Sequence, residues 1–306
     1  MNRREFLEAS VTGAGALLGA ALLGPAVTGC GGASPRPAVP PPPPPVDAFL
    51  AKGARVMWIA AHPDDESWCG TLLARASIHY GNPLSMLVLT RGDGGECCLK
   101  VGCKPDLATV RGQEMRAVAA RYRAALQHER FWSAPLPVES FPKRHKIFDL
   151  WRRQRDPVEV VARAVRKFRP DLVLTFDPDV GATGHPEHQL ASRVATAGIR
   201  LAAWADLRLD ALRPHHVART YYVVNRIWLY RLIGRADPGH VSERFDATLP
   251  CTRTMSCLRF MTEATKLHRT QANDMSMVRN FRSLFSRVNL RWIDPYREIR
   301  EPTEPA

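Results

Sequence analysis

The chain has 306 residues, and 45% of them are hydrophobic, which is enough for one large core. One domain with a tail and two domains fit this length equally well. The 43 Lys and Arg residues exceed the 30 Asp and Glu residues, for a net charge of +13. Such a charge favours anionic neighbours, although a solvated basic face is the simpler explanation. No Lys/Arg-rich repeat or known nucleic-acid-binding module is present, so we expect no nucleic-acid partner.

The first 30 residues have the pattern of an export signal. Arg3 and Arg4 precede an apolar, Gly/Ala-rich run at residues 11–27, and a charged start before an apolar core is typical of such signals. The paired arginines resemble the twin-arginine class. The run ends at Cys30 in Val-Thr-Gly-Cys, which resembles the lipobox of bacterial lipoproteins. We expect export by the twin-arginine route and a lipid anchor on Cys30 at the periplasmic or extracellular face of a membrane. An uncleaved transmembrane anchor is the alternative, against which the glycines and the proline argue.

Residues 31–46 are rich in proline and form a predicted linker. The tract at residues 40–45 favours an extended polyproline conformation of about 3.1 Å per residue. An SH3-type ligand has a similar composition, but an exported protein does not normally meet SH3 domains. We therefore interpret this tract as a tether that lifts a domain of residues 47–306 off the membrane.

The domain opens with alternating strands and helices. Residues 55–61 and 84–90 are apolar runs typical of buried parallel strands, and residues 67–80 between them have helical spacing. This order predicts a right-handed crossover and a mostly parallel sheet flanked by helices, which is an α/β fold.

Further elements follow in the same manner. We expect helices at residues 107–126, 157–168 and 185–204, strands at 128–133, 171–176, 217–224 and 227–232, and one or two helices within 254–279. The basic and aromatic stretch at residues 134–156 is either an insertion that roofs a pocket or a solvated surface loop.

Cysteine usage fits an exported chain. If Cys30 is lipidated, one of the 7 cysteines is used. Disulfides are expected outside the cytoplasm, but their pairing cannot be read from sequence. The available partners are Cys97, Cys98, Cys103, Cys251 and Cys257. Cys69 falls inside a predicted helix and is expected to be a small core residue.

Two polar motifs follow predicted strands at distant points in the chain. His62, Asp64 and Asp65 come directly after the first strand, and His185 and His188 open the helix after the strand at 171–176. Open α/β sheets carry their ligand sites at the carboxyl ends of the strands, so we expect the two motifs to meet. Imidazole and carboxylate ligands suit zinc, although such a set accepts other divalent ions.

These motifs also carry a family resemblance. His-Pro-Asp-Asp-Glu at residues 62–66 and Gly-His-Pro-Glu-His at residues 184–188 together resemble the PIG-L/LmbE family of zinc-dependent N-deacetylases. The resemblance spans residues 55–271. It implies a Rossmann-like α/β fold and removal of acetyl groups from N-acetylglucosamine-type amines.

Carried over by position, the resemblance implies that His62, Asp65 and His188 bind zinc. Asp64 would be the general base. His185 would stabilise the oxyanion or donate a proton, and would add a positive charge if protonated. Three protein ligands leave zinc an open position for a water, whose pKa then falls towards about 7. Asp64 would take a proton from this water and pass one to the leaving amine.

Four further residues are predicted to bind substrate. Arg91 and Asp93 lie in a glycine-rich loop after the second strand. Arg111 matches a family pattern after that strand. His268 lies in a segment resembling a family motif that ends His-x-Ser-Gln, here with Thr270 for the serine.

The leading hypothesis is a lipid-anchored, metal-dependent hydrolase that deacetylates N-acetylated amino sugars or glycoconjugates. An amidase or esterase acting on another substrate class is a second hypothesis. A surface lipoprotein that binds glycans or metal without turnover is a third. Asp64 argues against the third hypothesis, because a pure binder needs ligands but no base beside them. The sugar, the acyl group and the oligomeric state stay open.

Overall fold

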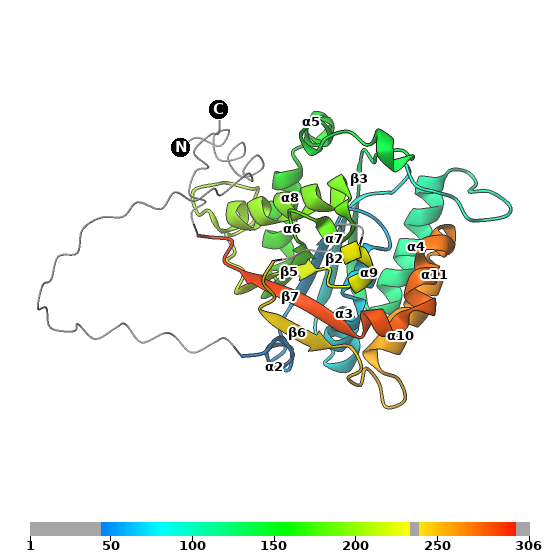
Figure 1. Cartoon of the computed structure of the whole chain (residues 1–306). Helices are drawn as coiled ribbons and strands as arrows, with labels where there is room; N and C mark the ends of the chain where they lie inside the picture. The colour runs from blue at the N-terminus through cyan, green and yellow to red at the C-terminus, as the bar shows by residue number, and fades with distance from the viewer. Residues whose placement is uncertain (1–43, 233–238, 298–306) are drawn as a thin grey trace, which may run out of the picture.

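The computed structural model describes residues 44–232 and 239–297 (Figure 1). The predicted export signal, Cys30 and most of the linker lie outside these residues and stay predictions. Within the two described ranges, no helix combines the length and the hydropathy needed to cross a membrane.

The core of the domain is a seven-stranded sheet in the order β3-β2-β1-β4-β5-β7-β6. Its strands are β1 (Val56–Ala60), β2 (Leu84–Thr90), β3 (Ala124–Phe131), β4 (Leu172–Phe176), β5 (Arg219–Val224), β6 (Glu243–Asp246) and β7 (Arg287–Ile293). The first five strands pair in parallel, and β7 and β6 add an antiparallel edge. The predicted α/β fold with a mostly parallel sheet is therefore confirmed. Chain order reverses at β1, between β2 and β4, which is where such folds open a crevice.

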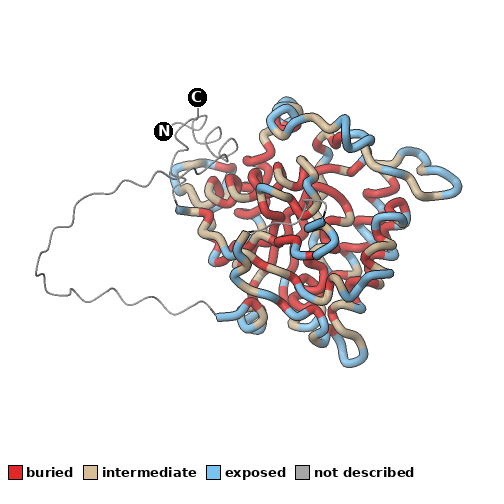
Figure 2. Tube along the Cα trace, viewed as in Figure 1, coloured by how far each residue is buried: buried red, intermediate tan, exposed pale blue. Residues whose placement is uncertain are grey.

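Helices cover both faces of this sheet (Figure 1). The α-helices are α2 (Val46–Leu50), α3 (Gly70–Ala74), α4 (Leu107–Arg121), α5 (Arg144–Gln154), α6 (Pro157–Phe168), α7 (Gly181–Gly184), α8 (Pro186–Ala203), α9 (Trp228–Leu232), α10 (Cys257–Ala264) and α11 (Ala272–Asn280). β1 is buried on both sides, so its side chains alternate between two cores. Val56 and Trp58 face a core that includes residues of α3, α4 and α10, and Met57 and Ile59 face a core with α6 and α8. β1, β2 and β4 are buried along their whole length, in agreement with the red tube through the centre of Figure 2.

Local signals explain the best-predicted elements. The strand predicted at residues 84–90 and the helix predicted at 157–168 have those bounds in the structure. Asp156 caps α6 by accepting hydrogen bonds from the backbone N–H of Val158 and Glu159, and Pro157 occupies the first turn. Arg169 ends the helix in a left-handed conformation.

Other predicted elements were wrong in part. The helix predicted at residues 107–126 stops at Arg121, because Arg123 takes a left-handed φ of 53° and β3 starts directly after it. The strand predicted at 227–232 is the short helix α9, which begins after the Asn225 side chain accepts a hydrogen bond from Ile227 N–H at 2.9 Å. An aromatic and β-branched run of this length has no period long enough to separate helix from strand.

The stretch at residues 134–156 has two parts. Its second half forms α5, which buries Ile147, Phe148 and Trp151 against the core and is therefore not a solvated loop. Its first half contributes Leu136 and Phe141 to the wall of a cleft. The prediction of an insertion beside a pocket is closer to the structure than the prediction of a surface loop.

One of the expected disulfides is formed. It joins Cys97 and Cys103 in the loop between β2 and α4. Cys98, Cys251 and Cys257 carry free thiols, and Cys69 is buried in the core as predicted.

The folded domain begins earlier than residue 47. Val46, which the sequence assigned to the linker, is the first residue of α2 and is buried together with Leu50. The α2 helix is tied to the domain by an ion pair between Asp47 and Arg75 and by a hydrogen bond from Asn82 Nδ2 to the Leu50 carbonyl at 2.8 Å. This helix is therefore part of the domain and not of the tether.

We expect Leu50→Ala to lower the free energy of unfolding by about 2–5 kcal/mol, because it removes a fully buried side chain and leaves a cavity. Lys52→Ala is the matched control, since Lys52 is exposed just after the same helix, and it should stay within about 0.5 kcal/mol of the wild type. Urea unfolding followed by circular dichroism measures both. Equal stabilities of the two variants would show that α2 contributes nothing to the domain.

Candidate functional site

The two motifs predicted to meet do so at the carboxyl ends of β1 and β4. His62, Asp64 and Asp65 lie in the turn after β1, and His185 and His188 lie at the start of α8. All five side chains line a cleft of about 510 Å³. The cleft thus brings together both halves of the predicted site.

Three side chains direct ligand atoms at a common point. His62 Nδ1 lies 3.0 Å from His188 Nε2, and Asp65 Oδ1 lies 3.0 Å from the same nitrogen. Asp65 Oδ2 is 3.7 Å from His62 Nδ1. Ligands held tetrahedrally at about 2.0–2.2 Å from zinc are roughly 3.3–3.6 Å apart. The observed spacings bracket that value, so the three residues fit a small divalent cation.

Hydrogen bonds behind the two rings fix which nitrogens face each other. His188 Nδ1 donates to the Gly181 carbonyl at 2.8 Å, and His62 Nε2 donates to Glu187 Oε2 at 2.5 Å. In the neutral rings the facing nitrogens therefore both carry lone pairs, which repel at 3.0 Å unless a proton or a cation lies between them. Burial lowers the pKa of His62, but hydrogen bonds to Asp65 and Glu187 outweigh it and raise that pKa to about 10. A bound cation would replace this proton.

Glu187 was missed by the sequence analysis. Its side chain is fully buried, and its carboxylate accepts hydrogen bonds from Ala134 N–H at 2.9 Å, from Ser133 Oγ at 3.3 Å and from His62. A carboxylate behind a ligand histidine orients the ring and raises its basicity. The one sequence signal that could have identified Glu187 was its place between His185 and His188 in the second motif.

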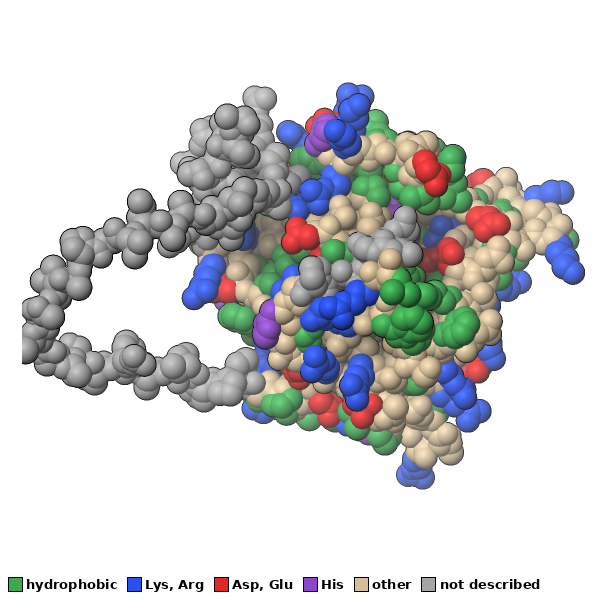
Figure 3. Space-filling model, viewed as in Figure 1, with side chains coloured by type: hydrophobic (Ala, Val, Ile, Leu, Met, Phe, Trp, Pro, Cys, Tyr) green, Lys and Arg blue, Asp and Glu red, His purple; other side chains and the backbone are tan. Residues whose placement is uncertain are grey.

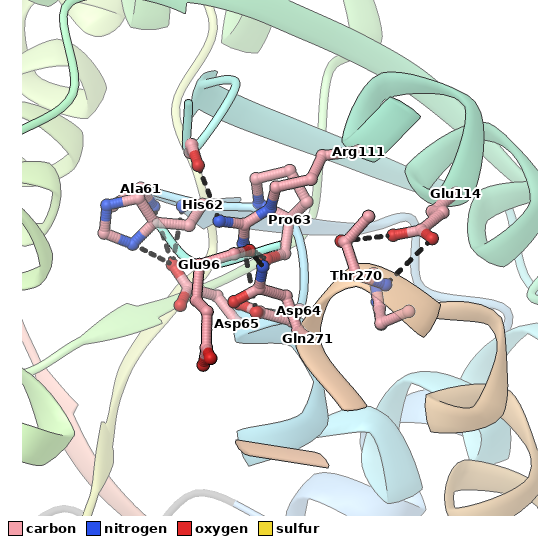
Figure 4. Close-up of polar contacts among 12 residues, drawn as sticks. Ala61, His62, Pro63, Asp64, Asp65, Glu96, Arg111, Glu114, Thr270 and Gln271 are labelled. Carbon is pink, nitrogen blue, oxygen red and sulfur yellow. Dashed lines mark hydrogen bonds and ion pairs between the residues drawn. The ribbon is translucent and has the colours of Figure 1, made fainter. Parts of the chain in front are cut away.

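Asp65 is held as a carboxylate by its own turn. Asp65 Oδ2 accepts hydrogen bonds from Ala61 N–H at 3.0 Å and from His62 N–H at 2.8 Å (Figure 4). Burial alone would raise the pKa of Asp65, but the adjacent His188 and His62 lower it well below its usual range. Asp65 therefore stays ionised, as a metal ligand must.

Asp64 occupies a strained backbone position and faces Arg111. Its φ is 93°, a left-handed value that is uncommon outside glycine. Arg111 Nη2 lies 3.0 Å from Asp64 Oδ2 and also donates to the Pro63 carbonyl at 2.6 Å, while Nη1 donates to the Gly92 carbonyl at 2.7 Å (Figure 4). Burial raises the pKa of Asp64, Arg111 lowers it and Asp65 raises it again, for a result of about 6. This carboxyl can therefore gain and lose a proton near neutral pH.

His268 does not line the cleft, in contrast to its predicted contact with substrate. It is buried, and its Nε2 lies 2.7 Å from Glu66 Oε1. Glu66 Oε2 in turn accepts a hydrogen bond from Asp64 N–H at 3.2 Å. His268 therefore supports the turn that carries Asp64, from a segment far away in the sequence.

His185 lines the cleft as a neutral imidazole. Its Nδ1 accepts a hydrogen bond from Glu187 N–H at 3.2 Å and caps α8, so the proton of the neutral ring resides on Nε2. Burial, followed by His62 and His188, lowers the pKa of His185 far below its ordinary value. The option of a positively charged His185 does not fit these surroundings, but a neutral ring still offers an N–H donor.

One nitrogen from each of His62, His185 and His188 falls within 4.8 Å of the others, so His185 competes with Asp65 as a third ligand.

Arg91 and Asp93 were expected to contact substrate, and the structure places both outside the cleft. Arg91 Nε and Nη2 donate to the carbonyls of Glu129 and His128 at 3.1 Å. The pairing of β2 with β3 shifts register between Val88 and Thr90, beside these two carbonyls, and such a bulge interrupts the ladder and leaves backbone groups that Arg91 can bind. Asp93 is exposed and lies with Arg91 in a separate hollow.

Away from the histidines the cleft has two apolar walls, and Glu96, Gln271, Asn273 and Asp274 form a polar part of its lining. One wall contains Leu136, Val138 and Phe141, and Phe141 lies 4.7 Å from the ring of His185. The opposite wall comes from α9, α11 and the turn that follows. Its side chains are Tyr230, Met275, Met277, Val278 and Phe285. The cleft can therefore hold a ligand larger than the group that reaches the metal ligands.

Comparison with known proteins extends these observations. Residues 57–199 match the model of the PIG-L family, described as GlcNAc-PI de-N-acetylase. The 1D-myo-inositol 2-acetamido-2-deoxy-alpha-D-glucopyranoside deacetylase of Rhodococcus opacus is 32% identical over 185 residues, which is 56% of this chain and 61% of that protein. The alignment thus covers about three fifths of that relative's length.

Solved structures agree on the fold. The N,N'-diacetylchitobiose deacetylase of Pyrococcus horikoshii has a TM-score of 0.59 at 17% identity, over 84% of this chain and 92% of that one. The 4-carboxy-2-hydroxymuconate hydratase of Pseudomonas putida has a TM-score of 0.55 at 14% identity, over 80% of this chain and 99% of that one. At these identities the likeness concerns the fold and not the reaction. The matched span of 57–199 contains both histidine motifs, so the resemblance to the PIG-L family that these motifs predicted is confirmed over that span.

Proposed function

We propose that this protein is a metal-dependent deacetylase of N-acetylated amino sugars or their conjugates. The observation that carries the proposal is the convergence of His62 Nδ1, His188 Nε2 and Asp65 Oδ1 beside Asp64 in one cleft. The PIG-L match and the printed activity of the Rhodococcus opacus relative support the substrate class. Zinc is the proposed cation, because two imidazoles and one carboxylate suit it.

The proposed reaction divides the work among a bound cation and three side chains. The bound cation would supply Lewis-acid chemistry, polarising the amide carbonyl and activating a water. Asp64 then accepts the proton of the attacking water and delivers one to the leaving amine. Arg111 holds Asp64 in place, and the Nε2–H of His185 donates to the oxygen that becomes negative. Release of the amine and acetate completes the hydrolysis.

The location of the enzyme is a separate part of the proposal. Residues 1–30 with Cys30 support export by the twin-arginine route and a lipid anchor on the outer side of a membrane. An exported deacetylase would meet N-acetylated sugars of the cell envelope or of its surroundings.

The proposed activity has a direct assay. Purified protein is incubated with N-acetylglucosamine oligomers, with and without a chelator, and free amine is measured. We expect amine release that the chelator abolishes and added zinc restores. Absence of free amine across a broad panel of N-acyl sugars, with glycan still bound, would favour a binding protein over an enzyme.

Asp64→Ala should keep the metal and lose activity. The variant removes the proton carrier but none of the three ligand atoms, so metal content by mass spectrometry stays at the wild-type level. The loss in kcat should be about 10²–10⁴-fold, the usual contribution of a positioned acid or base. Full activity in zinc-loaded Asp64→Ala protein would rule out this role.

His185→Ala separates the oxyanion role from the ligand role. If His185 is a donor to the oxyanion, kcat falls by about 10²–10³-fold and the metal stays bound. His188→Ala is the matched control from the same helix and should lose the metal. Loss of metal from His185→Ala to the same extent as from His188→Ala would instead identify His185 as a ligand.

The pH dependence should follow the ionisation of Asp64. The base must be deprotonated, so kcat/KM should fall as the pH drops below the pKa of Asp64, which is about 6 without metal and lower with a cation bound. Arg111→Gln removes the positive charge that lowers this pKa, so the acid limb of the pH profile should move to higher pH. Arg116→Gln, on the exposed side of the same helix, should leave the limb in place. An unchanged limb in Arg111→Gln would contradict the assignment of Asp64.

A further inference from the structure

A second groove adjoins the cleft. It has a volume of about 320 Å³ and lies at the carboxyl end of β5, between the segment leading into α9 and the β6–β7 hairpin. Trp68 and Phe285 line both the cleft and this groove. Their rings lie 5.9 Å apart, and together they form a shared aromatic wall. A ligand that occupies the cleft can therefore extend past this wall into the groove.

The groove is strongly basic. Among residues 44–232 and 239–297, those that line it include Arg226, Arg244 and Arg287 but no Asp or Glu. Figure 3 shows Lys and Arg side chains gathered over β6 and β7, next to hydrophobic side chains at α9. Arginine forks suit planar oxyanions such as carboxylate and phosphate, which they bind through paired hydrogen bonds.

The hairpin explains why two of these arginines share one face. β6 and β7 are antiparallel, with Arg244 opposite Asn289 and Asp246 opposite Arg287. Directly opposed residues, and every second residue along a strand, lie on the same side of a sheet. Arg244, Arg287 and Asn289 are therefore neighbours on the side of the hairpin that lines the groove.

The hydrogen-bonding capacity of Arg244 and Arg287 is not taken up by acidic side chains of the described residues. Among residues 44–232 and 239–297, neither Arg244 nor Arg287 forms an ion pair. The cross-strand Asp246 carboxylate instead accepts hydrogen bonds from Thr248 N–H at 2.8 Å and Thr248 Oγ1 at 2.7 Å, and Asp246 does not line the groove. The hydrogen bonds from Thr248 lower the pKa of Asp246 and Arg287 helps to lower it further, but both arginines are exposed residues that an external anion can reach.

We propose that this groove binds an oxyanion group, carboxylate or phosphate, on the sugar chain whose N-acetyl group enters the cleft. The substrate is then an acidic glycan or glycoconjugate and not a neutral oligosaccharide. This inference rests on the proposed deacetylase function for the part that involves turnover. The binding of the anion itself does not depend on it.

The test compares three N-acetylated sugars on zinc-loaded protein at low salt. N,N'-diacetylchitobiose is neutral, a hyaluronan tetrasaccharide carries carboxylates, and N-acetylglucosamine 1-phosphate carries a phosphate. We expect kcat/KM to be higher for at least one acidic sugar, and the sugar that is preferred identifies the anion. The preference should weaken as salt rises from about 0.05 to 0.5 M, because exposed charges are screened over a shorter distance.

A double variant, Arg244→Gln with Arg287→Gln, should lower the ratio of kcat/KM for the acidic over the neutral sugar by about tenfold, because a charged hydrogen-bonding site is lost. The matched control is Arg208→Gln with Arg213→Gln. It makes the same change in charge at exposed positions in the loop before β5, at the opposite end of the sheet. The control should keep the wild-type ratio. An unchanged ratio in the groove variant, with wild-type thermal stability, overturns the proposal.

Titration calorimetry with the hyaluronan tetrasaccharide and N-acetylglucosamine 1-phosphate separates the two proposals. If no sugar is deacetylated but the wild type binds an acidic sugar and the groove variant does not, the proposed reaction is wrong and the proposed anion site in the groove is supported. If all three sugars are deacetylated with equal kcat/KM, the proposed reaction is supported and the proposed anion site in the groove is wrong. Binding to phosphatidylglycerol vesicles without any preference among the sugars also overturns the groove proposal, since it makes the arginines a membrane contact.

Discussion

The active region depends on two imidazole nitrogens that are held face to face. His62 and His188 each use their other ring nitrogen to donate a hydrogen bond, one to Glu187 and one to the Gly181 carbonyl. Those outer bonds leave two lone pairs 3.0 Å apart in a buried place, which is unfavourable unless positive charge lies between them. A proton on His62, whose pKa is about 10, or a bound cation removes the repulsion between these lone pairs. Metal affinity should therefore come from a preformed site whose two rings cannot turn away.

Support for this site comes from parts of the chain that are distant in sequence. Glu66 binds both His268 and the backbone of Asp64, and Thr270 donates two hydrogen bonds to Glu114 at 2.6 and 3.0 Å (Figure 4). Each of these carboxylates is buried and would be costly to hide alone. The family match ends at residue 199, yet the turn at residues 268–271 completes these networks. Two buried carboxylates of the matched region thus find their hydrogen-bond partners in a C-terminal segment that lies outside it.

The sequence predicted those features that leave a local signal. The apolar runs of β1, β2 and β4 and the capped helix α6 were located well, because a buried strand and a helix cap each produce a recognisable pattern in consecutive residues. The candidate ligands were named from the family resemblance of two motifs that each follow a strand, and the structure brings those two motifs together in one cleft. The supporting roles of Glu187 and His268 could not be predicted, since each depends on a partner more than fifty positions away. The prediction for Arg91 was wrong for a related reason: its position after β2 suggested the cleft, but its guanidinium binds two carbonyls of β3, beside a register shift that the sequence does not reveal.

The division of the chain also suggests how reaction and selectivity are separated. The proposed metal ligands, Asp64 and Arg111 all lie within residues 57–199, where the family match holds. The basic groove and one wall of the cleft come almost entirely from residues after 199, with Trp68 as the link between them. A fold that also occurs in a hydratase does not determine the reaction, and the residues around His62 and His188 do not by themselves determine which substrate reaches them. Because the hairpin arginines touch none of the ligand residues, substrate charge can change through β6 and β7 while the buried polar centre stays intact.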